Sequence, residues 1–413
     1  MHVMEGASPN KVKLPERTTE IKKKKIKSNT RKLYLFHFLM GFYLISGVII
    51  PFFLIWGGLT FIEFALLQSY YTIMIIIFEI PCGAIADRLN RKLCLFLSGL
   101  SSAIGALIYG IIPNIFLFIL GETLFAFGTA LMSGTNEALI YESLKISGRE
   151  KEFSKIVGKS NAIFFLGLVI SAPIGGIIAY YFSLPLVMIL MFFPYMCGAL
   201  ITLTIRDPKV HKKKKSHNVF SKIKSGFSTL KNNRILRILT FDMIIIELFV
   251  VFLFLSYQYY LIKELSIPLI YLGFIEAFLT LFQAIFINLL STLEKEAKNK
   301  KRLLYLNTLI PAIGYILIGI IFFAPLIIIL IIITVGFGLS RYIILLNGIN
   351  KQLNEENRVT VLSTINIFRM GIKAMILPFI AIMLMWDMSI AFIILGIMIL
   401  LFMLKSKVKK EFL

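Results

Sequence analysis

Charged residues are scarce in this chain. Asp, Glu, Lys and Arg make up 16% of its 413 residues, whereas hydrophobic residues make up 58%. A soluble domain carries roughly 25% charged residues and has too little interior to bury this much apolar side chain. The composition therefore excludes an ordinary soluble enzyme or binding domain and indicates a membrane protein.

Cysteine is also rare. The three cysteines, Cys82, Cys94 and Cys197, fall in or beside apolar segments and have no paired spacing. We expect them to be small buried hydrophobic residues rather than parts of a disulfide framework. The apolar segments also lack a set of His, Asp and Glu at metal-ligand spacing, so no metal site is expected.

A nucleotide-binding motif is missing as well. The chain has no Gly-x-x-x-x-Gly-Lys-Ser/Thr pattern, whose backbone amides would cradle a nucleotide's phosphates. ATP hydrolysis by this chain is therefore excluded. We expect no cofactor, no catalytic residues and no enzymatic activity.

Long apolar runs are abundant. Stretches of about 20 apolar residues recur along the whole chain, and each can cross roughly 30 Å of hydrocarbon as an α-helix. They are too long, and too poor in alternating polarity, to be strands of a β-barrel. We predict an all-α polytopic membrane protein with twelve transmembrane helices, at residues 33–57, 63–86, 93–112, 114–140, 156–181, 183–205, 236–262, 268–291, 302–323, 325–348, 358–384 and 388–405.

The basic residues test this helix count, because Lys and Arg hold loops on the cytoplasmic face. Of the 44 Lys and Arg, Arg341, Arg369 and Lys373 lie deep inside predicted helices, away from their cytoplasmic ends, and Lys263 lies on the outer side. The other 40 lie in segments that are cytoplasmic if the N-terminus is cytoplasmic. We therefore expect a multi-pass protein of the cell (plasma) membrane with both termini in the cytoplasm.

A basic segment divides the chain into two halves of six helices each, which predicts two pseudo-symmetric repeats around a central cavity. The basic runs IKKKKIK and HKKKKSH are expected to anchor the topology, helped by anionic lipid, and not to bind nucleic acid. The predicted parts are a basic cytoplasmic N-tail (1–32), a six-helix bundle (33–205), a basic cytoplasmic linker (206–235), a second six-helix bundle (236–405) and a cytoplasmic C-tail (406–413).

One polar segment, GAIADRLNRK at residues 83–92, interrupts two apolar runs on the predicted cytoplasmic face. Gly83 would let a neighbouring helix approach closely. Asp87 lies at the bilayer edge, where an acid needs a base or the positive N-terminal end of another helix as its partner. Arg88, Arg91 and Lys92 can supply further pairs across the cytoplasmic mouth.

This segment resembles the loop motif Gly-x-x-x-Asp-Arg-x-Gly-Arg-Lys/Arg of the major facilitator superfamily of secondary transporters. The match departs at Asn90, where the family prefers Gly, although Asn tolerates a left-handed turn. The resemblance covers roughly residues 33–405. It implies the twelve-helix fold of that family, with Asp87 contacting the start of the eleventh helix and helping to lock the cytoplasmic side in the outward-open state.

Three other stretches look like the efflux-type branch of the family: FEIPCG at 78–83, ALIYESLK at 138–145 and RVTVLS at 358–363. The stretch GLVISAPIGG at 167–176 matches poorly the fifth-helix motif of antiporters, so the antiport direction stays open.

Ionisable side chains inside the membrane are candidate functional residues, because each costs at least about 2.5–3.5 kcal/mol at the bilayer centre. Asp242 and Glu137 lie nearer the cytoplasmic ends and are expected to reach water. The third, sixth, ninth and twelfth predicted helices have no interior charge. This agrees with the peripheral, lipid-facing positions that these helices have in the family that the chain resembles. The candidates for substrate binding or proton coupling are Glu122, Glu247, Glu276, Arg341, Arg369 and Lys373.

Each of these charges could instead belong to a structural ion pair. Glu247 and Arg369 both lie about 11 residues from the cytoplasmic end of their helices, which is ~16 Å deep at 1.5 Å per residue. In the family that the chain resembles, the seventh and eleventh helices are neighbours, and we therefore predict that these two side chains face each other or share the cavity.

The leading hypothesis is a secondary active transporter working by alternating access, most simply a monomeric, proton-coupled exporter of small amphipathic molecules or drugs. Uptake or exchange of an anionic metabolite is the alternative, favoured by Arg341, Arg369 and Lys373. A membrane-embedded enzyme and a non-transporting receptor are remoter alternatives. The sequence does not identify the substrate, the direction of transport, the coupling ion with its stoichiometry, or the oligomeric state.

Overall fold

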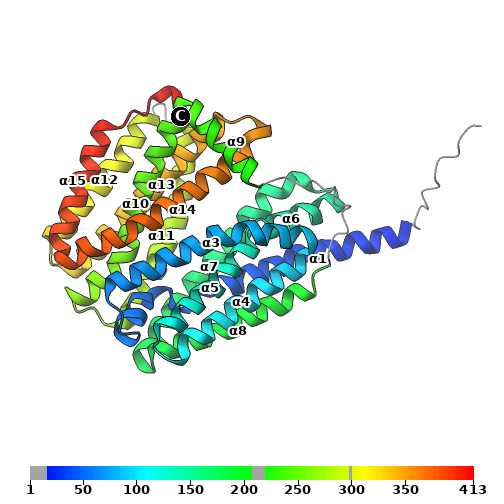
Figure 1. Cartoon of the computed structure of the whole chain (residues 1–413), viewed down its shortest axis with the longest axis horizontal. Coiled ribbons are helices and arrows are strands. Elements are labelled where there is room, and N and C mark those ends of the chain that lie inside the picture. Colours follow the sequence, from blue (N-terminus) through cyan, green and yellow to red (C-terminus); the bar gives the residue numbers. More distant parts are fainter. Residues whose placement is uncertain (1–15, 207–218, 297–299) are drawn as a thin grey trace, which may run out of the picture.

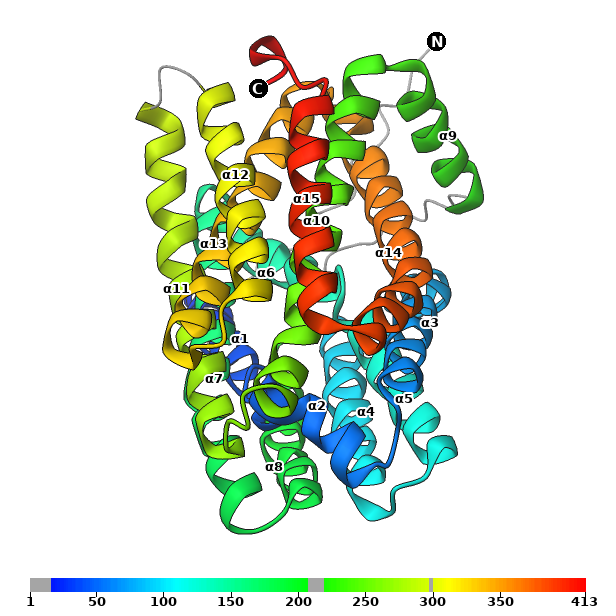
Figure 2. The same cartoon turned by 90° about the vertical axis from the view of Figure 1, so that its left-hand side faces the viewer.

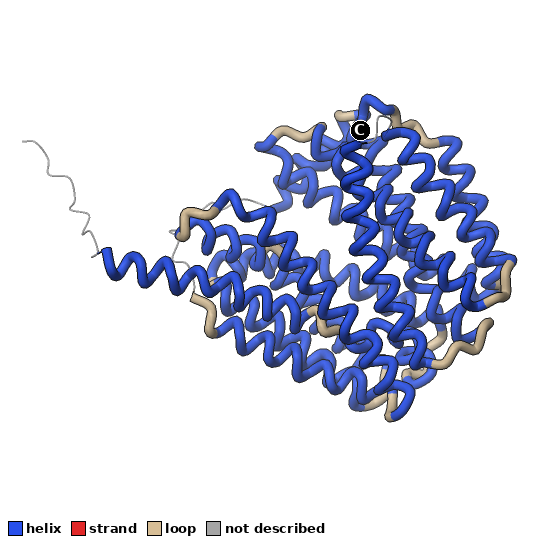
Figure 3. The backbone as a smooth tube through the Cα atoms, turned by 180° about the vertical axis from the view of Figure 1, so that it is seen from behind, coloured by secondary structure: helices blue, strands red, loops and turns tan. Residues whose placement is uncertain are grey.

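The structure is a computed structural model, and it describes residues 16–206, 219–296 and 300–413. These residues form helices joined by short loops, with no strand among them (Figure 3). Twelve helical segments in this part of the chain are long and apolar enough to cross a membrane, judged by length and composition. The predicted fold class and the predicted number of spans are confirmed.

The first six spans form the N-terminal bundle, shown from blue to green in Figure 1. Their helical elements are α1 (Glu16–Met40), η1 (Leu44–Val48), α2 (Ile49–Pro51), η2 (Phe52–Trp56), α3 (Phe61–Arg88), α4 (Arg91–Ile111), α5 (Ile115–Met132), α6 (Thr135–Ile146), η3 (Glu150–Glu152), α7 (Phe153–Tyr181) and α8 (Leu184–Leu203).

The other six spans form the C-terminal bundle, shown from green to red in the same figure. The helix α9 precedes this bundle. The elements are α9 (Val219–Asn232), α10 (Arg234–Lys263), α11 (Leu269–Glu296), α12 (Lys300–Ile320), α13 (Ala324–Lys351), α14 (Glu355–Trp386), α15 (Met388–Lys405) and η4 (Lys410–Phe412).

The two bundles repeat one packing pattern. In the N-terminal bundle α4 packs against α8 and α5, and in the C-terminal bundle the corresponding α12 packs against α15 and α13. The pairs α4–α8 and α12–α15 lie at opposite edges of the molecule in Figure 1. Between the bundles, α7 packs against α11 and α3 packs against α14. This arrangement is that of two six-helix repeats.

Side-chain caps fix where several helices begin. Thr60 and Glu63 form a capping box at the start of α3, in which each side chain bonds the other residue's backbone amide. The side chain of Asn233 accepts hydrogen bonds from two backbone amides at the start of α10, and Asp387 accepts one from Ile390 N (2.8 Å) at the start of α15. These caps satisfy amides that have no partner within the helix.

Two predicted helices are broken. The first, expected over 33–57, stops at Met40 and resumes at Leu44 in a different helical form, and a Cβ on Gly41 would lie 2.1 Å from Phe164 O of α7. The fourth, expected over 114–140, is interrupted by Gly134 with φ +70°, a conformation that glycine adopts readily. The apolar pattern continues through the first break, so hydropathy could not reveal it, whereas the second break lies in a polar stretch, Ser-Gly-Thr-Asn-Glu, at residues 133–137.

The predicted linker and tails also contain ordered structure. Within the predicted linker, α9 packs against α14, beside the C-terminal bundle (Figure 2). The predicted C-tail packs against its own bundle, with Val408 3% and Leu413 7% exposed. Residues 1–15 of the predicted N-tail and residues 207–218 of the linker lie outside the described part of the chain.

The bundles touch closely at the end of the molecule where α7 finishes and α11 starts. A Cβ added to Gly47 would lie 2.6 Å from Gly273 Cα, and one added to Gly273 would lie 2.3 Å from Ala172 O. The rings of Phe61 and Tyr259 stack near this contact at a centroid distance of 4.8 Å. Only glycine allows backbones this close. Because the twelve spans alternate in direction, this contact lies at the end of the molecule opposite to the start of α1 and the end of α15.

Candidate functional site

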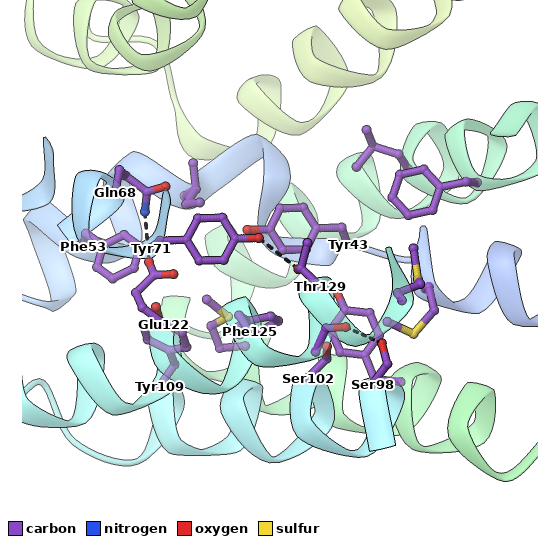
Figure 4. Close-up of a pocket in the computed structure, with 18 residues that line it drawn as sticks. Tyr43, Phe53, Gln68, Tyr71, Ser98, Ser102, Tyr109, Glu122, Phe125 and Thr129 are labelled. Atoms are coloured by element: carbon purple, nitrogen blue, oxygen red, sulfur yellow. Dashed lines mark hydrogen bonds between the residues drawn. The ribbon is translucent and has the colours of Figure 1, made fainter. Parts of the chain in front are cut away.

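One cavity lies inside the N-terminal bundle and has a volume of about 400 Å³. All of its lining residues belong to that bundle. Aromatic and sulfur-containing side chains dominate the wall, and part of it is drawn in Figure 4. These side chains are Tyr43, Phe53, Tyr71, Tyr109, Phe125, Phe164, Tyr195, Met40, Met132 and Met188.

Among the residues that line this cavity, Glu122 alone has a side chain of the Asp, Glu, Lys or Arg type. It lies in α5 and is 5% exposed. Its Oε1 accepts a hydrogen bond from Gln68 Nε2 of α3 at 3.0 Å (Figure 4), and the hydroxyl of Tyr109 of α4 is also bonded to its carboxyl group. Both partners are neutral. An ionised carboxyl group here would be buried without a counter-charge, which is unfavourable in a membrane.

A second cavity, of about 260 Å³, lies between the two bundles. Two acids and two bases line it: Glu79 of α3, Glu247 of α10, and Arg369 and Lys373 of α14. The formal charges of these four side chains cancel.

A shared wall separates the two cavities. Tyr71 of α3 and Thr129 of α5 line both of them, and their hydroxyl groups are hydrogen-bonded at 3.1 Å (Figure 4).

The predicted pairing of Glu247 with Arg369 is confirmed. Arg369 Nη1 lies 2.9 Å from Glu247 Oε1, and the two side chains are 26% and 18% exposed. Arg369 also donates to the hydroxyl of Tyr342 at 3.2 Å and to Asn366 Oδ1 at 2.7 Å. The other carboxyl oxygen of Glu247 has no hydrogen-bond partner among the described residues.

Glu79 is not among the six charges selected from the sequence. In the structure it lines the second cavity, and its buried Oε2 has no hydrogen-bond partner among the described residues. A signal was present: Glu79 lies seven residues before the last residue of the predicted helix 63–86. At 1.5 Å per residue this places Glu79 about 10 Å from the helix end, too deep for an interfacial residue.

Glu276 lines neither cavity and is 7% exposed. Its carboxylate accepts a hydrogen bond from the hydroxyl of Tyr257 at 2.5 Å. Gln258 Nε2 donates to that same hydroxyl at 3.0 Å and to Ser46 O at 2.7 Å, while Gln258 Oε1 accepts from Ile50 N at 3.1 Å. A buried hydrogen-bond chain thus joins Glu276 of the C-terminal bundle to the broken first span of the N-terminal bundle.

Arg341, expected to be a cavity charge, lines neither cavity. It is 1% exposed and binds Asp242 through two guanidinium nitrogens, Nε at 3.1 Å and Nη2. Its Nη1 donates to Leu304 O at 2.9 Å and to the hydroxyl of Thr308. Asp242, expected to reach water, is 2% exposed. The expectation for Asp242 was wrong because its position near a helix end did not show that α12, α13 and residue 406 cover it.

The segment 83–92 is placed only in part. Gly83 is exposed, and no heavy atom of the described residues lies within 4 Å of the position of an added Cβ, so the expected close helix approach is absent from this structure. Lys92 lies half-buried in the first turn of α4. The side chains of Asp87 and Arg88 lie outside the described part of the chain.

Arg91 has its ion-pair partner within its own bundle. It binds Glu142 of α6 with two bonds, Nη2 to Oε1 at 2.6 Å and Nε to Oε2 at 2.8 Å. Glu142 belongs to the stretch ALIYESLK, so this bond joins two of the motifs noted in the sequence. It ties α4 to α6 rather than spanning the mouth between the bundles.

Comparisons with known proteins agree with this architecture. A family model described as Major Facilitator Superfamily matches residues 33–373. Two uncharacterized transporters of Buchnera aphidicola, from subsp. Acyrthosiphon pisum and subsp. Schizaphis graminum, are 30% identical over 145 residues and 36% identical over 99 residues. The aligned regions cover 35% and 24% of this chain but only 36% and 25% of those relatives.

Solved structures match over nearly the whole chain at low identity. A mutant of the nucleoside transporter NupG gives a TM-score of 0.77 at 13% identity, covering 91% of this chain and 98% of that one. A D-xylose–proton symporter gives 0.70 at 14% identity, covering 94% and 99%. An inward-facing bacterial homolog of the lysosomal transporter Spinster gives 0.69 at 16% identity, covering 86% and 81%. At these identities the matches show the fold alone.

Proposed function

This chain belongs to the Major Facilitator Superfamily, and on that premise we propose that it is a proton-coupled exporter of small amphipathic molecules. The observation that carries the proposal is the cavity in the N-terminal bundle. It joins an aromatic wall to one acid, Glu122, with no Lys or Arg among its lining residues. Such a cavity suits a molecule with an apolar body and a positive group.

The chemistry of Glu122 links the substrate to the proton. A buried carboxylate bonded only to neutral groups needs a positive partner, which is either a proton on its own oxygen or a cationic group of the substrate. The two partners exclude each other at one carboxyl group, and mutual exclusion of this kind is the basis of exchange. The faces of Tyr43, Tyr71 and Tyr195 would add cation–π attraction to an organic cation.

Alternating access would come from rocking of the two bundles about their interface. If the termini are cytoplasmic, as the distribution of Lys and Arg predicts, the glycine contact of Gly47 with Gly273 lies on the outer side. The structure would then correspond to a state closed toward the outside. We further propose that the protein works as a monomer in the plasma membrane, with the segment 83–92 as its cytoplasmic gate.

Uptake or exchange of an anionic metabolite is the alternative function. It would use Arg369 and Lys373, the two bases of the second cavity. Glu79 and Glu247 line that cavity as well, so its formal charge is balanced, and Arg369 is already bound to Glu247. The third base expected in this role, Arg341, is bound to Asp242. These pairings favour the exporter.

The test is flux into proteoliposomes with and without an imposed pH gradient, using one panel of cationic amphiphiles and one of organic anions. We expect a pH gradient to drive accumulation of cationic amphiphiles only. Glu122→Gln should abolish this coupling while the purified protein keeps its melting temperature, because glutamine keeps the shape and one acceptor oxygen for Gln68 but not the charge.

Glu137→Gln, the same change at an exposed residue of α6, is the matched control and should behave like the unaltered protein. Driven transport of anions alone, or full coupling in Glu122→Gln, would contradict the proposal.

A further inference from the structure

A third cavity lies at the end of the C-terminal bundle that carries the C-terminus, and we propose that it binds a phosphate group, as carried by the headgroup of an anionic phospholipid. The cavity has a volume of about 400 Å³, within the range of ordinary ligand pockets. It lies apart from both cavities described above and shares no lining residue with them.

The charge of this cavity is of one sign. Its lining includes Arg234 at the start of α10, Lys301 at the start of α12, and Lys407 and Lys409 in the segment after α15. None of the described residues that line it is Asp or Glu, and the acid of the following turn, Glu411, is not among its lining residues. Four like charges around one cavity repel one another, so an anion that lies between them is stabilised by all four.

The two lysines after α15 are held in place by the protein. Residues 406–409 are not helical, and side chains alternate in such an extended segment. Ser406 donates a hydrogen bond to the buried Asp242 at 2.6 Å, and Val408 is 3% exposed. Lys407 and Lys409, the alternate residues, are both exposed. The bases are thus fixed by a buried anchor and are not on a free tail.

The rest of the cavity suits a lipid rather than a small anion alone. Ile238, Val408 and Phe412 supply apolar lining beside the charges. One turn deeper along α10, Phe241 is 63% exposed, and Leu404 near the end of α15 is 75% exposed. These exposed apolar residues lie on spans that cross the bilayer, so acyl chains can cover them while the phosphate group accepts hydrogen bonds from arginine and lysine.

The proposal is tested by lipid retention measured with native mass spectrometry of the full chain from nanodiscs. The nanodiscs contain equal amounts of phosphatidylglycerol and phosphatidylcholine. We expect the protein to retain phosphatidylglycerol preferentially. Lys407→Gln combined with Lys409→Gln should weaken that retention about 30-fold, since each base near an anionic lipid surface contributes a several-fold factor.

Lys151→Gln combined with Lys155→Gln is the matched control, because it removes two exposed charges from the other bundle. The control should retain phosphatidylglycerol as the unaltered protein does. Equal retention of both lipids, or the same loss in both double variants, would overturn the proposal. Melting temperatures in phosphatidylcholine alone show that both variants are folded.

A second arm separates the two sources of the phosphate group. Inorganic phosphate is titrated against the protein in phosphatidylcholine nanodiscs, with the melting temperature as readout. A lipid site predicts a shift with phosphatidylglycerol and none with phosphate up to millimolar concentration. A shift with phosphate that is lost in the Lys407/Lys409 double variant would support the phosphate site but assign it to a soluble phosphate compound. No shift with either probe overturns the proposal.

Discussion

At the scale of single residues, the charges inside the membrane fall into groups with different surroundings. Arg341 and Asp242 form a pair that is almost fully buried, whereas Glu247 and Arg369 form a pair beside a cavity. Glu122 and Glu276 are buried carboxyl groups that receive hydrogen bonds from neutral side chains. We therefore expect the first pair to hold the fold together, and we expect a change of partner or protonation during transport among the other groups.

A double-mutant cycle tests the Glu247–Arg369 pair. Glu247→Gln or Arg369→Gln alone leaves one charge without its partner, which costs about 3–5 kcal/mol for a fully buried pair and less here, because both side chains are partly exposed. We expect each single variant to lower the melting temperature and the double variant to recover part of the loss. The measurement is thermal unfolding of the purified protein.

The control for this cycle is the pair Arg149–Glu152, which lies on the surface between α6 and α7 with side chains 32% and 41% exposed. The hydrogen bond to Glu152 raises the pKa of Arg149 above its ordinary value. An exposed pair is worth about 0–1 kcal/mol, so Arg149→Gln should change the melting temperature little. If Glu247→Gln melts normally and loses only the pH dependence of transport, Glu247 carries the proton instead of holding the fold.

The sequence revealed the Glu247–Arg369 pair because both residues lie equally deep in neighbouring helices. It could not reveal that Arg341 is bound to Asp242, since the depth of a residue does not show which way its side chain points. Tyr257, which donates to Glu276, and Gln258, which donates to Tyr257, lie in an apolar helix and gave no signal.

At the scale of elements, the contact between α7 and α11 depends on glycine. Gly273→Ala would place a Cβ 2.3 Å from a backbone oxygen of Ala172, which cannot move without the helix. We therefore expect this variant to separate α7 from α11 and to favour the state open at that end. To measure this, a cysteine is introduced at Ser102, which lines the cavity. Its reaction with an impermeant thiol reagent added from the outside should become several-fold faster.

Gly158→Ala is the control for this variant, because no heavy atom of the described residues lies within 4 Å of its added Cβ. Unchanged accessibility in Gly273→Ala would mean that the contact does not close the molecule. The same increase in Gly158→Ala would mean that the effect is not specific to the contact.

The elements also show what hydropathy can and cannot predict. Twelve runs of apolar residues were enough to predict the number of spans, because each span must be long enough to cross the hydrocarbon core of the bilayer. The break at Gly134 is a local turn within a polar stretch. The break at Gly41 does not change the apolar content and depends on a contact with α7, and the helix α9 depends on contacts with α14. Such contacts can be found only in the folded chain.

At the scale of the whole molecule, the orientation in the membrane can be tested directly. In a chain without its three native cysteines, single cysteines are placed at Ser225 of α9 and at Ser266 between α10 and α11. An impermeant maleimide applied to intact cells should label position 266 and leave position 225 unlabelled, whereas broken membranes should allow both to react. The opposite labelling in intact cells would invert the predicted topology.

The cavity that contains Glu122 has a thermodynamic consequence that follows from its lining by the N-terminal bundle alone. A ligand shifts an equilibrium between two states only by its difference in affinity for them, and moving it from 1:99 to 99:1 takes about a 10⁴-fold difference. A substrate bound within one rigid bundle contacts the same atoms in the inward-open and the outward-open state, except at Tyr71 and Thr129, which border the neighbouring bundle. Such a carrier should bind its cargo equally tightly from either side of the membrane, and the ion gradient alone would set the direction of net flow.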